Sequence, residues 1–298
     1  MPVLVFLVLC GIWGSTWLFI KLGLQDLPPI SFAGIRFVIA ALVLAVLIAA
    51  RRARLPKRGS DLKLLAATGF MAFSMNYGLL FWGEQHVSSG LAALLQATVP
   101  LFGLITGHFY LPAERITTAK LTGVLLGLVG VGLICSDQMY SGGSRALQGS
   151  VAIVVGAAAM AYANVLIKAR GLHMDPAVLA AGQMIFGLVP LLGIGILLEG
   201  NPLHFHWTRL AIVSLFYLSL VGSSLAFILY YWLIRHMAVF NTMLISLVTP
   251  IVATLIGMIV LDEKITWRIG AGGAVILAGI GLILLHARML GAVKSTLS

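Results

Sequence analysis

Long apolar stretches, separated by short polar segments, recur along the whole chain. A helix needs about 20 mostly apolar residues to cross a bilayer, because roughly 30 Å of hydrocarbon is covered at about 1.5 Å per residue. The alternating apolar and polar positions of membrane barrel strands do not occur, so helices are the predicted spanning elements. We therefore predict an all-α polytopic membrane protein with ten transmembrane helices, over residues 3–22, 30–50, 64–84, 88–110, 117–136, 149–168, 176–198, 210–234, 239–260 and 266–286.

Composition places these helices in lipid. Hydrophobic residues make up 60% of the chain and charged residues 9%, and the mean hydropathy is +1.07. A soluble domain has about a quarter of its residues charged, so a soluble fold is excluded. The net charge of +10 does not indicate a nucleic-acid partner, because the basic residues lie in short runs between apolar stretches, without an aromatic-basic platform. The first stretch is predicted to be an uncleaved membrane helix, since no basic segment precedes it and the apolar run continues to Ile20.

Lysine and arginine are distributed unequally between the two sides that this helix order defines. Of the 19 lysines and arginines, thirteen lie in loops on the same side of the membrane as the N-terminus, and five lie on the opposite side. The remaining one, Arg36, lies within a helix. Cytoplasmic loops of membrane proteins are enriched in lysine and arginine. We therefore expect both termini to lie in the cytoplasm.

The two halves of the sequence match each other in a nearly constant register. Residues 81–100 correspond to residues 231–250 at a shift of 150, which pairs Gln96 with Ser246. Each half holds five predicted helices, and an odd number makes the second copy enter the membrane in the opposite sense. We therefore predict two inverted five-helix repeats, residues 1–140 and 141–298. Further matching segments are 114–117 with 263–266 and 130–134 with 279–283 at a shift of 149, and 20–21 with 167–168 at a shift of 147.

On these features the chain resembles the EamA-type branch of the drug/metabolite transporter superfamily. The resemblance covers essentially the whole chain and rests on the ten helices in two halves, the tryptophan-containing first helix and the Glu-Arg/Lys-Ile-Thr segments at 114–117 and 263–266. Within that branch the chain is most similar to bacterial YddG-type exporters of aromatic and other neutral amino acids. The resemblance implies a multi-pass protein of the bacterial inner membrane with a small-molecule substrate and no cofactor or metal. Whether it is a monomer or a homodimer is left open.

Polar residues inside the predicted helices are the candidates for a substrate site, because a polar group in hydrocarbon is costly and needs a structural or functional reason. Asn, Gln and Ser side chains can hydrogen-bond ammonium and carboxylate groups, and Trp and Tyr can pack against an apolar side chain. The alternative is that these residues bond a neighbouring helix, which contributes only about 1 kcal/mol each. The predicted substrate-binding residues are Trp17, Asn76, Tyr77, Gln96, Tyr162, Asn164, Ser223, Ser224, Tyr230 and Ser246.

Charged side chains within the predicted helices are few. Arg36 lies about six residues from the outer end of its helix, so its side chain can extend to the surface, and we favour anchoring over substrate binding for it. All nine acidic residues fall in loops or at helix ends, with Glu84 nearest to the membrane. Proton- and sodium-driven carriers usually place an acid near the midplane. The sequence therefore favours facilitated diffusion, or coupling through a less obvious group.

Glycines and prolines predict where helices pack closely or bend. Pro100 and Pro250 interrupt apolar stretches, where they can kink a helix or leave carbonyl groups unpaired. The last predicted helix of each half is rich in glycine, so we expect these two helices to pack tightly as a scaffold or dimer surface away from the transport pathway. The glycines concerned are Gly123, Gly127, Gly130, Gly270, Gly273 and Gly279.

Other classes of protein fit the sequence less well. A membrane enzyme is disfavoured because His-Glu-x-x-His, Gly-x-Ser-x-Gly and Gly-Lys-Ser motifs are absent, as is a pair of carboxylates within the helices. An ion channel would need a filter loop or charged rings, and a receptor or structural role would leave the repeat unexplained. The predicted function is export or facilitated diffusion of small neutral or amphipathic metabolites by alternating access. Amino acids are the first choice of substrate, and nucleobases or cationic compounds are the alternatives.

Overall fold

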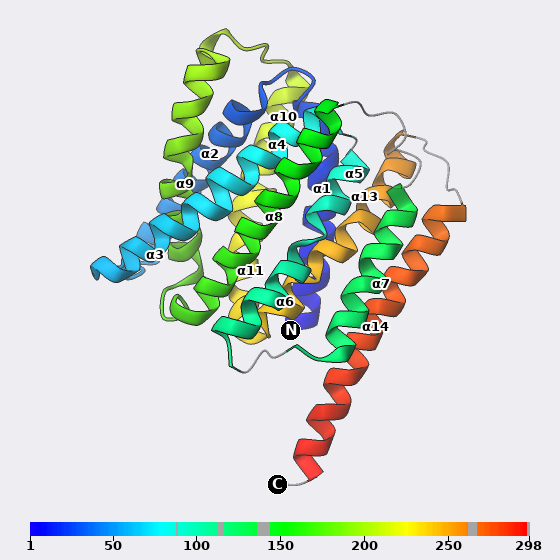
Figure 1. The fold of residues 1–298 in the computed structure, drawn as a ribbon. Coiled ribbons are helices and arrows are strands. Elements are labelled where there is room, and N and C mark those ends of the chain that lie inside the picture. The colour runs from blue at the N-terminus through cyan, green and yellow to red at the C-terminus, as the bar shows by residue number, and fades with distance from the viewer. Residues whose placement is uncertain (88, 113–115, 136–143, 262–266, 297–298) are drawn as a thin grey trace.

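The computed structural model describes residues 1–298 apart from 88, 113–115, 136–143, 262–266 and 297–298 (Figure 1). Within this described part all regular secondary structure is helical, and there is no strand. The first half comprises α1 (Pro2–Gly23), α2 (Pro29–Ala50), α3 (Gly59–Gly69), the π-helical η1 (Phe70–Met75), α4 (Asn76–His86), α5 (Ser89–Gln96), α6 (Val99–Tyr110) and α7 (Thr118–Cys135). The second half comprises α8 (Ser144–Arg170), α9 (Pro176–Glu199), the short η3 (Pro202–His204), α10 (Arg209–Ser219), the π-helical η4 (Leu220–Leu225), α11 (Ala226–His236), α12 (Val239–Met243), α13 (Ile245–Leu261) and α14 (Trp267–Thr296).

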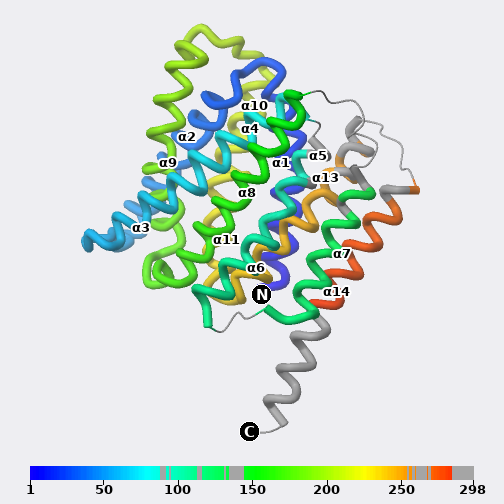
Figure 2. Tube along the Cα trace, in the orientation of Figure 1, coloured from blue at the N-terminus to red at the C-terminus, as the bar shows by residue number. Residues whose placement is uncertain are grey.

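Helices from the two halves of the sequence pack against one another in one bundle. In the chain trace, α1 in blue lies against α13 in orange, although they are at opposite ends of the sequence (Figure 2). In the same way α2 packs on α9, α4 on α8, and α7 on α14. The interior of the bundle is therefore built jointly by both halves.

Among the residues that the structure describes, six helical stretches are long and apolar enough to cross a membrane: 2–23, 29–50, 59–86, 144–170, 176–199 and 209–236. The predicted spans 88–110 and 239–260 are each interrupted, so neither is a single continuous helix in the structure. The first divides into α5 and α6, and the second divides into α12 and α13. Pro100 lies in the first turn of α6, where its missing N–H costs no helical hydrogen bond. Pro250 lies inside α13, and its ring leaves the Ser246 carbonyl without the usual helical donor.

Each half contains one long span that is widened in the middle by a π-helical turn. In 59–86 this turn is η1, and in 209–236 it is η4, which begins 150 residues later. π-Helical turns are rare and often mark functional sites. The sequence repeat is thus matched by a repeat of an uncommon backbone feature, which hydropathy did not predict.

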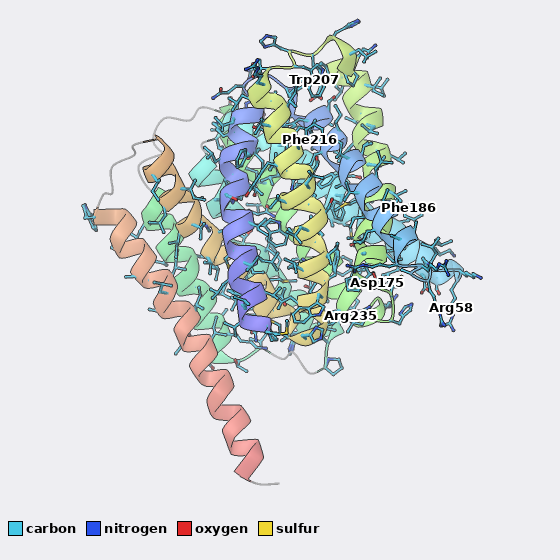
Figure 3. The ribbon with its side chains drawn as sticks, turned by 180° about the vertical axis from the view of Figure 1, so that it is seen from behind. Arg58, Asp175, Phe186, Trp207, Phe216 and Arg235 are labelled. Carbon is cyan, nitrogen blue, oxygen red and sulfur yellow. The ribbon has the colours of Figure 1, made fainter. Side chains whose placement is uncertain are left out.

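The outer faces of the helices are apolar and the ends of the bundle are polar. Figure 3 shows Phe186 and Phe216 projecting outward from α9 and α10, whereas Arg58 and Arg235 lie toward the end of the bundle opposite Trp207. Large apolar side chains elsewhere on the surface are strongly exposed, as at Leu197, which is 83% exposed. Exposed apolar faces of this extent are stable only in lipid. Together with the six spanning helices, they make this a multi-pass membrane protein.

Glycines bring α7 and α14 into backbone contact, but only part of the predicted set takes part. Gly270 and Gly273 have open space where a Cβ would be, and Gly127 packs on the Leu247 side chain of α13. A Cβ atom added to Gly123 would lie 2.7 Å from the carbonyl oxygen of Gly279, and one added to Gly130 would lie 2.5 Å from that of Gly272. No real Cβ approaches backbone so closely. In contrast, Gly132 on α7 has open space where a Cβ would be. The close contact therefore depends on particular glycines of α7.

The end of α9 caps the start of α2. The Glu199 carboxylate accepts hydrogen bonds from the backbone N–H groups of Ile30 (2.9 Å) and Ser31 (2.7 Å). Helix N-termini leave such groups unpaired, and the positive end of the helix dipole favours a carboxylate there. The contact joins the two halves, because α2 and α9 belong to different ones.

We expect Glu199→Gln to lower the unfolding free energy by about 1–2 kcal/mol, since it removes the charge from two hydrogen bonds at a partly exposed site. The readout is the thermal unfolding of the purified protein in detergent. Asp61→Asn is the control: it removes a carboxylate that pairs with the exposed His173 and is expected to have a smaller effect. Equal stability of Glu199→Gln and the unsubstituted protein would show that the cap contributes nothing.

Candidate functional site

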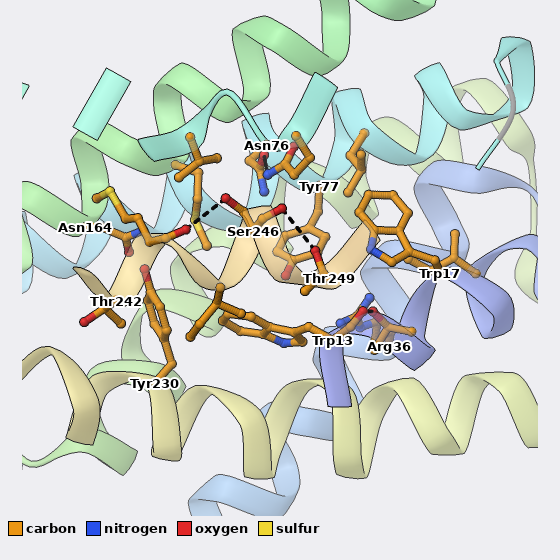
Figure 4. Close-up of a pocket in the computed structure, with 18 residues that line it drawn as sticks. Trp13, Trp17, Arg36, Asn76, Tyr77, Asn164, Tyr230, Thr242, Ser246 and Thr249 are labelled. Carbon is orange, nitrogen blue, oxygen red and sulfur yellow. Dashed lines mark hydrogen bonds between the residues drawn. The ribbon is translucent and has the colours of Figure 1, made fainter. Parts of the chain in front are cut away.

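A cavity of about 90 Å³ lies inside the bundle, between helices of both halves (Figure 4). Since about 10–15 Å³ of such space holds one water molecule, the cavity has room for several waters or a small solute. Its walls come chiefly from α1, α4, α8, α12 and α13. The lining residues are Trp13, Thr16, Trp17, Ile20, Arg36, Asn76, Tyr77, Leu80, Gln96, Val99, Met160, Asn164, Tyr230, Thr242, Met243, Ile245, Ser246 and Thr249.

Seven of the ten predicted substrate-binding residues line this cavity: Trp17, Asn76, Tyr77, Gln96, Asn164, Tyr230 and Ser246. The structure places the other three outside it. Tyr162 shares a 2.9 Å hydrogen bond with the Tyr110 hydroxyl on an exposed face. Ser223 accepts a hydrogen bond from Arg36, and Ser224 donates to the backbone carbonyls of Ala40 and Ser219. These three side chains are occupied in helix–helix contacts, which was the alternative considered for every member of the set.

Amide groups supply much of the polar surface of the cavity. The Gln96 Nε2 atom donates to Asn76 Oδ1 at 3.1 Å, which joins α5 to α4. The Gln96 Oε1 atom and both amide atoms of Asn164 are buried without a hydrogen-bond partner in the described part of the chain. An unpaired buried polar atom costs about 1–3 kcal/mol. Beside a cavity, these atoms are available to water or to a polar solute.

Aromatic rings form another part of the lining. The Trp13 ring packs 5.0 Å from the Tyr230 ring and 5.6 Å from the Phe227 ring, measured between centroids. The Trp13 indole N–H donates to the Gly222 carbonyl at 3.2 Å, within the π-helical η4. This bond fixes the indole ring, so that the cavity presents a rigid apolar wall beside the amide groups.

Arg36 was expected to extend to the surface, and the structure shows this to be wrong. Its side chain is 1% exposed and lines the cavity. Its Nε atom donates to Ser223 Oγ at 2.7 Å and its Nη2 atom donates to the Gly222 carbonyl at 3.3 Å. The error arose because distance to the helix end does not reveal which face of a helix is buried. Arg36 lies on the face of α2 that packs against η4.

Glu84 also differs from its expected environment. It lies two residues before the end of α4, as predicted for an acid near a helix end, but its side chain is fully buried. Neither carboxylate oxygen has a hydrogen-bond partner among the residues that the structure describes. Glu84 does not line the cavity. A buried acid is therefore present near one end of the bundle, away from the proposed pathway.

Several lining residues were missed in the sequence, although helical spacing points to them. Trp13 lies one turn before Trp17 on α1, and Thr249 lies three residues after Ser246 on α13. Residues three or four positions apart share a helix face. Thr249 Oγ1 donates to the Ser246 carbonyl at 3.3 Å. This carbonyl lacks its usual backbone donor because Pro250 has no N–H.

Many lining residues occur in pairs related by the sequence repeat. At the shift of 147 on α1 and α8, and of 150 elsewhere, both members of five pairs face the cavity. The pairs are Trp13 with Met160, Trp17 with Asn164, Leu80 with Tyr230, Gln96 with Ser246, and Val99 with Thr249. The cavity therefore lies where equivalent positions of the two halves converge.

A multi-pass helical bundle with an interior cavity of mixed aromatic and amide character defines the class of membrane transporters. The chain belongs to the EamA-like transporter family, which it matches twice, over residues 1–136 and 147–285. It is 30% identical over 275 residues to the uncharacterized transporter YoaV of Bacillus subtilis, covering 90% of this chain and 91% of YoaV. It is 30% identical to the uncharacterized inner membrane transporter YedA of Escherichia coli, covering 83% and 78% of the two chains.

Two further similarities bear on activity and on fold. The chain is 26% identical over 296 residues to a probable amino-acid metabolite efflux pump of Escherichia coli, covering 97% of this chain and 96% of the other. A solved crystal structure matches 97% of this chain, and 98% of its own, with a TM-score of 0.80 at 18% identity. At that identity the match supports the fold alone.

Proposed function

We propose that the protein is a carrier that exports, or facilitates the diffusion of, small neutral or amphipathic metabolites, with amino acids as the leading substrates. The observation that carries this proposal is the cavity, which combines indole and phenol rings with unpaired amide groups inside the helix bundle. Rings suit an apolar side chain, and amide groups suit the polar end of an amino acid. The similarity to a probable amino-acid metabolite efflux pump supports the same choice. Nucleobases and cationic compounds are the alternative substrates.

The proposed mechanism is alternating access by two inverted five-helix repeats, residues 1–140 and 141–298. Counting α3–η1–α4, α5–α6, α10–η4–α11 and α12–α13 as one span each gives five spans in each half. The two family matches, the π-helical turns 150 residues apart and the paired lining residues support this architecture. Exchange of conformations between the halves would open the cavity to each side of the membrane in turn.

We propose the bacterial inner membrane as the location, with both termini in the cytoplasm. The named location of the relative YedA supports the first point. Basic residues support the second: Arg54, Lys57, Arg58 and Arg235 line one hollow together, at the end of the bundle assigned to the cytoplasm. Accessibility of single introduced cysteines to a membrane-impermeant reagent would test the orientation.

Counterflow in proteoliposomes tests the function. Liposomes loaded with an unlabelled neutral amino acid should take up the labelled compound at the same rate with and without a proton gradient. Asn164→Leu should slow this exchange roughly tenfold or more, because it removes an amide from the cavity and its hydrogen bonds to solute are worth about 1–3 kcal/mol. The control is Tyr162→Phe, two residues away on α8 but outside the cavity, and it should exchange at a normal rate.

Each contrary result has a defined meaning. If nucleobases or cationic compounds exchange and amino acids do not, the carrier mechanism stands and the substrate assignment is wrong. If a proton gradient drives accumulation, the carrier is coupled and the facilitator mechanism is wrong. If Asn164→Leu exchanges normally while Tyr162→Phe does not, the cavity is not the binding site.

A further inference from the structure

The charge inside the cavity is unbalanced. Among the residues that line it, all of which lie in the described part of the chain, Arg36 is the sole side chain with a full charge. The lining contains no Asp or Glu. An arginine guanidinium cannot be deprotonated in proteins, so the side chains that line the cavity carry one net positive charge.

The contacts of Arg36 position the guanidinium without neutralising it. Its two acceptors, Ser223 Oγ and the Gly222 carbonyl, are uncharged. The rings of Phe37 and Tyr77 lie with their centroids 5.2 and 5.1 Å from Cζ, within the range of cation–π attraction. Nη1 is buried and has no acceptor within hydrogen-bond geometry in the described residues. A buried cation without a counter-charge is costly, and an anion bound beside it would offset part of that cost.

We infer that Arg36 binds the carboxylate of the transported solute, so that the substrates of this carrier are monocarboxylates. This inference rests on the proposed carrier function and deepens it. Arginine binds carboxylates through charge-assisted hydrogen bonds, and the unpaired Nη1 provides a donor for one. A single guanidinium balances one carboxylate but not a phosphate ester with two charges. Arg36 is thus a specificity-determining residue within the cavity.

The rest of the lining indicates what else the solute can carry. Because the lining has no carboxylate, an ammonium group on the solute meets only neutral acceptors, such as Gln96 Oε1 and Asn164 Oδ1. Those contacts are weaker than an ion pair. The carboxylate is therefore the required group, and the amino group contributes less to binding.

The test compares three ligands that share a benzyl group: L-phenylalanine, 3-phenylpropionate, which lacks the ammonium group, and phenethylamine, which lacks the carboxylate. Parallel isobutyl compounds are leucine, 4-methylpentanoate and isoamylamine. Binding to the purified full-length protein is measured by the fluorescence of its tryptophans, two of which, Trp13 and Trp17, line the cavity. The unsubstituted protein should bind both carboxylates of a series at least roughly tenfold more tightly than the amine.

Substitution of Arg36 should change this ligand selectivity and not merely the affinity. Arg36→Gln should weaken binding of the carboxylates roughly tenfold or more and leave amine binding unchanged or improved. Arg36→Lys should recover part of the preference for carboxylates, since it restores the charge without the planar fork. If Arg36 had a purely structural role, its substitution would weaken the binding of all three ligands alike.

Several outcomes would overturn the inference. They are equal binding of amine and carboxylate by the unsubstituted protein, binding of no carboxylate in either series, and an Arg36→Gln protein that retains the carboxylate preference. If Arg36→Gln does not fold, the ligand series on the unsubstituted protein and on Arg36→Lys still decides the matter. If 3-phenylpropionate binds through Arg36 but no amino acid exchanges in liposomes, the inference stands and the amino-acid assignment fails. If amino acids exchange equally well in the Arg36→Gln protein and in the unsubstituted one, the carrier function stands and the role of Arg36 in carboxylate binding is wrong.

Discussion

Replacing Ser246 with tryptophan should abolish solute exchange while leaving the protein folded. Ser246 lines the cavity near the start of α13, and its hydroxyl donates to the carbonyl of Met243, the last residue of α12, at 2.9 Å. An indole at this position would occupy much of the space of about 90 Å³. Since the substitution fills a cavity and does not displace packed side chains, we expect little loss of stability. The measurement is counterflow exchange, which we expect to fall to the background of protein-free liposomes.

A matched substitution separates blocking from general damage. Leu197→Trp introduces the same indole on the outer face of α9, where the original side chain is 83% exposed. Its exchange rate should remain close to normal. Normal exchange by Ser246→Trp, with unfolding temperatures that confirm folded protein, would mean that solute does not pass through this cavity.

The second large effect concerns the contact between α7 and α14. Gly123→Val should lower the unfolding free energy by several kcal/mol, because its Cβ alone would lie 2.7 Å from the Gly279 carbonyl oxygen and 2.5 Å from Ile283 Cγ1. Overpacking of a well-packed contact typically costs about 1–3 kcal/mol, and backbone on the opposing side cannot rotate away as a side chain can. The expected readout is a markedly lower unfolding temperature and a reduced yield of folded protein.

Gly132→Val provides the control within the same helix. It adds the same β-branched side chain and the same change in helix propensity, but at a position with open space. The difference between the two variants therefore measures the steric contact alone. If both variants unfold at the same temperature, the close approach of α7 and α14 does not stabilise the protein.

Much of the helical framework followed from hydropathy alone, because the length of hydrocarbon to be crossed fixes the length of each apolar stretch. The predicted starts of the spans 30–50 and 176–198 lie within one residue of Pro29 and Pro176, which begin α2 and α9, where a missing N–H costs nothing. Hydropathy did not predict two features: the division of the predicted spans 88–110 and 239–260, and the π-helical turns. They depend on which backbone hydrogen bonds form within a stretch that is apolar throughout, and average hydropathy contains no information about that.

The cavity lining was predicted in part, and the misplaced residues share one physical cause. Polarity within an apolar stretch correctly selected Asn76, Gln96 and Asn164 as residues of the bundle interior, now seen at the cavity. Which face a residue occupies was harder to infer. Tyr162 and Asn164 are two positions apart, so they point about 200° apart on a helix, and only Asn164 reaches the cavity. Arg36 was misplaced for the same reason, since its depth was judged along the helix axis and not around it.

The five residue pairs at the cavity occupy equivalent positions but differ in chemistry, as Trp17 and Asn164 do. When the two halves exchange conformations, the carrier opens to the other side of the membrane. A bound solute therefore contacts different residues in the two conformations. The half-saturation concentrations on the two faces of the membrane need not be equal. In an uncoupled carrier, however, microscopic reversibility requires the maximal rates in the two directions to differ by the compensating ratio. Such unlike pairs can thus adapt each face to the solute concentration it encounters, while the gradient alone sets the net direction of flow.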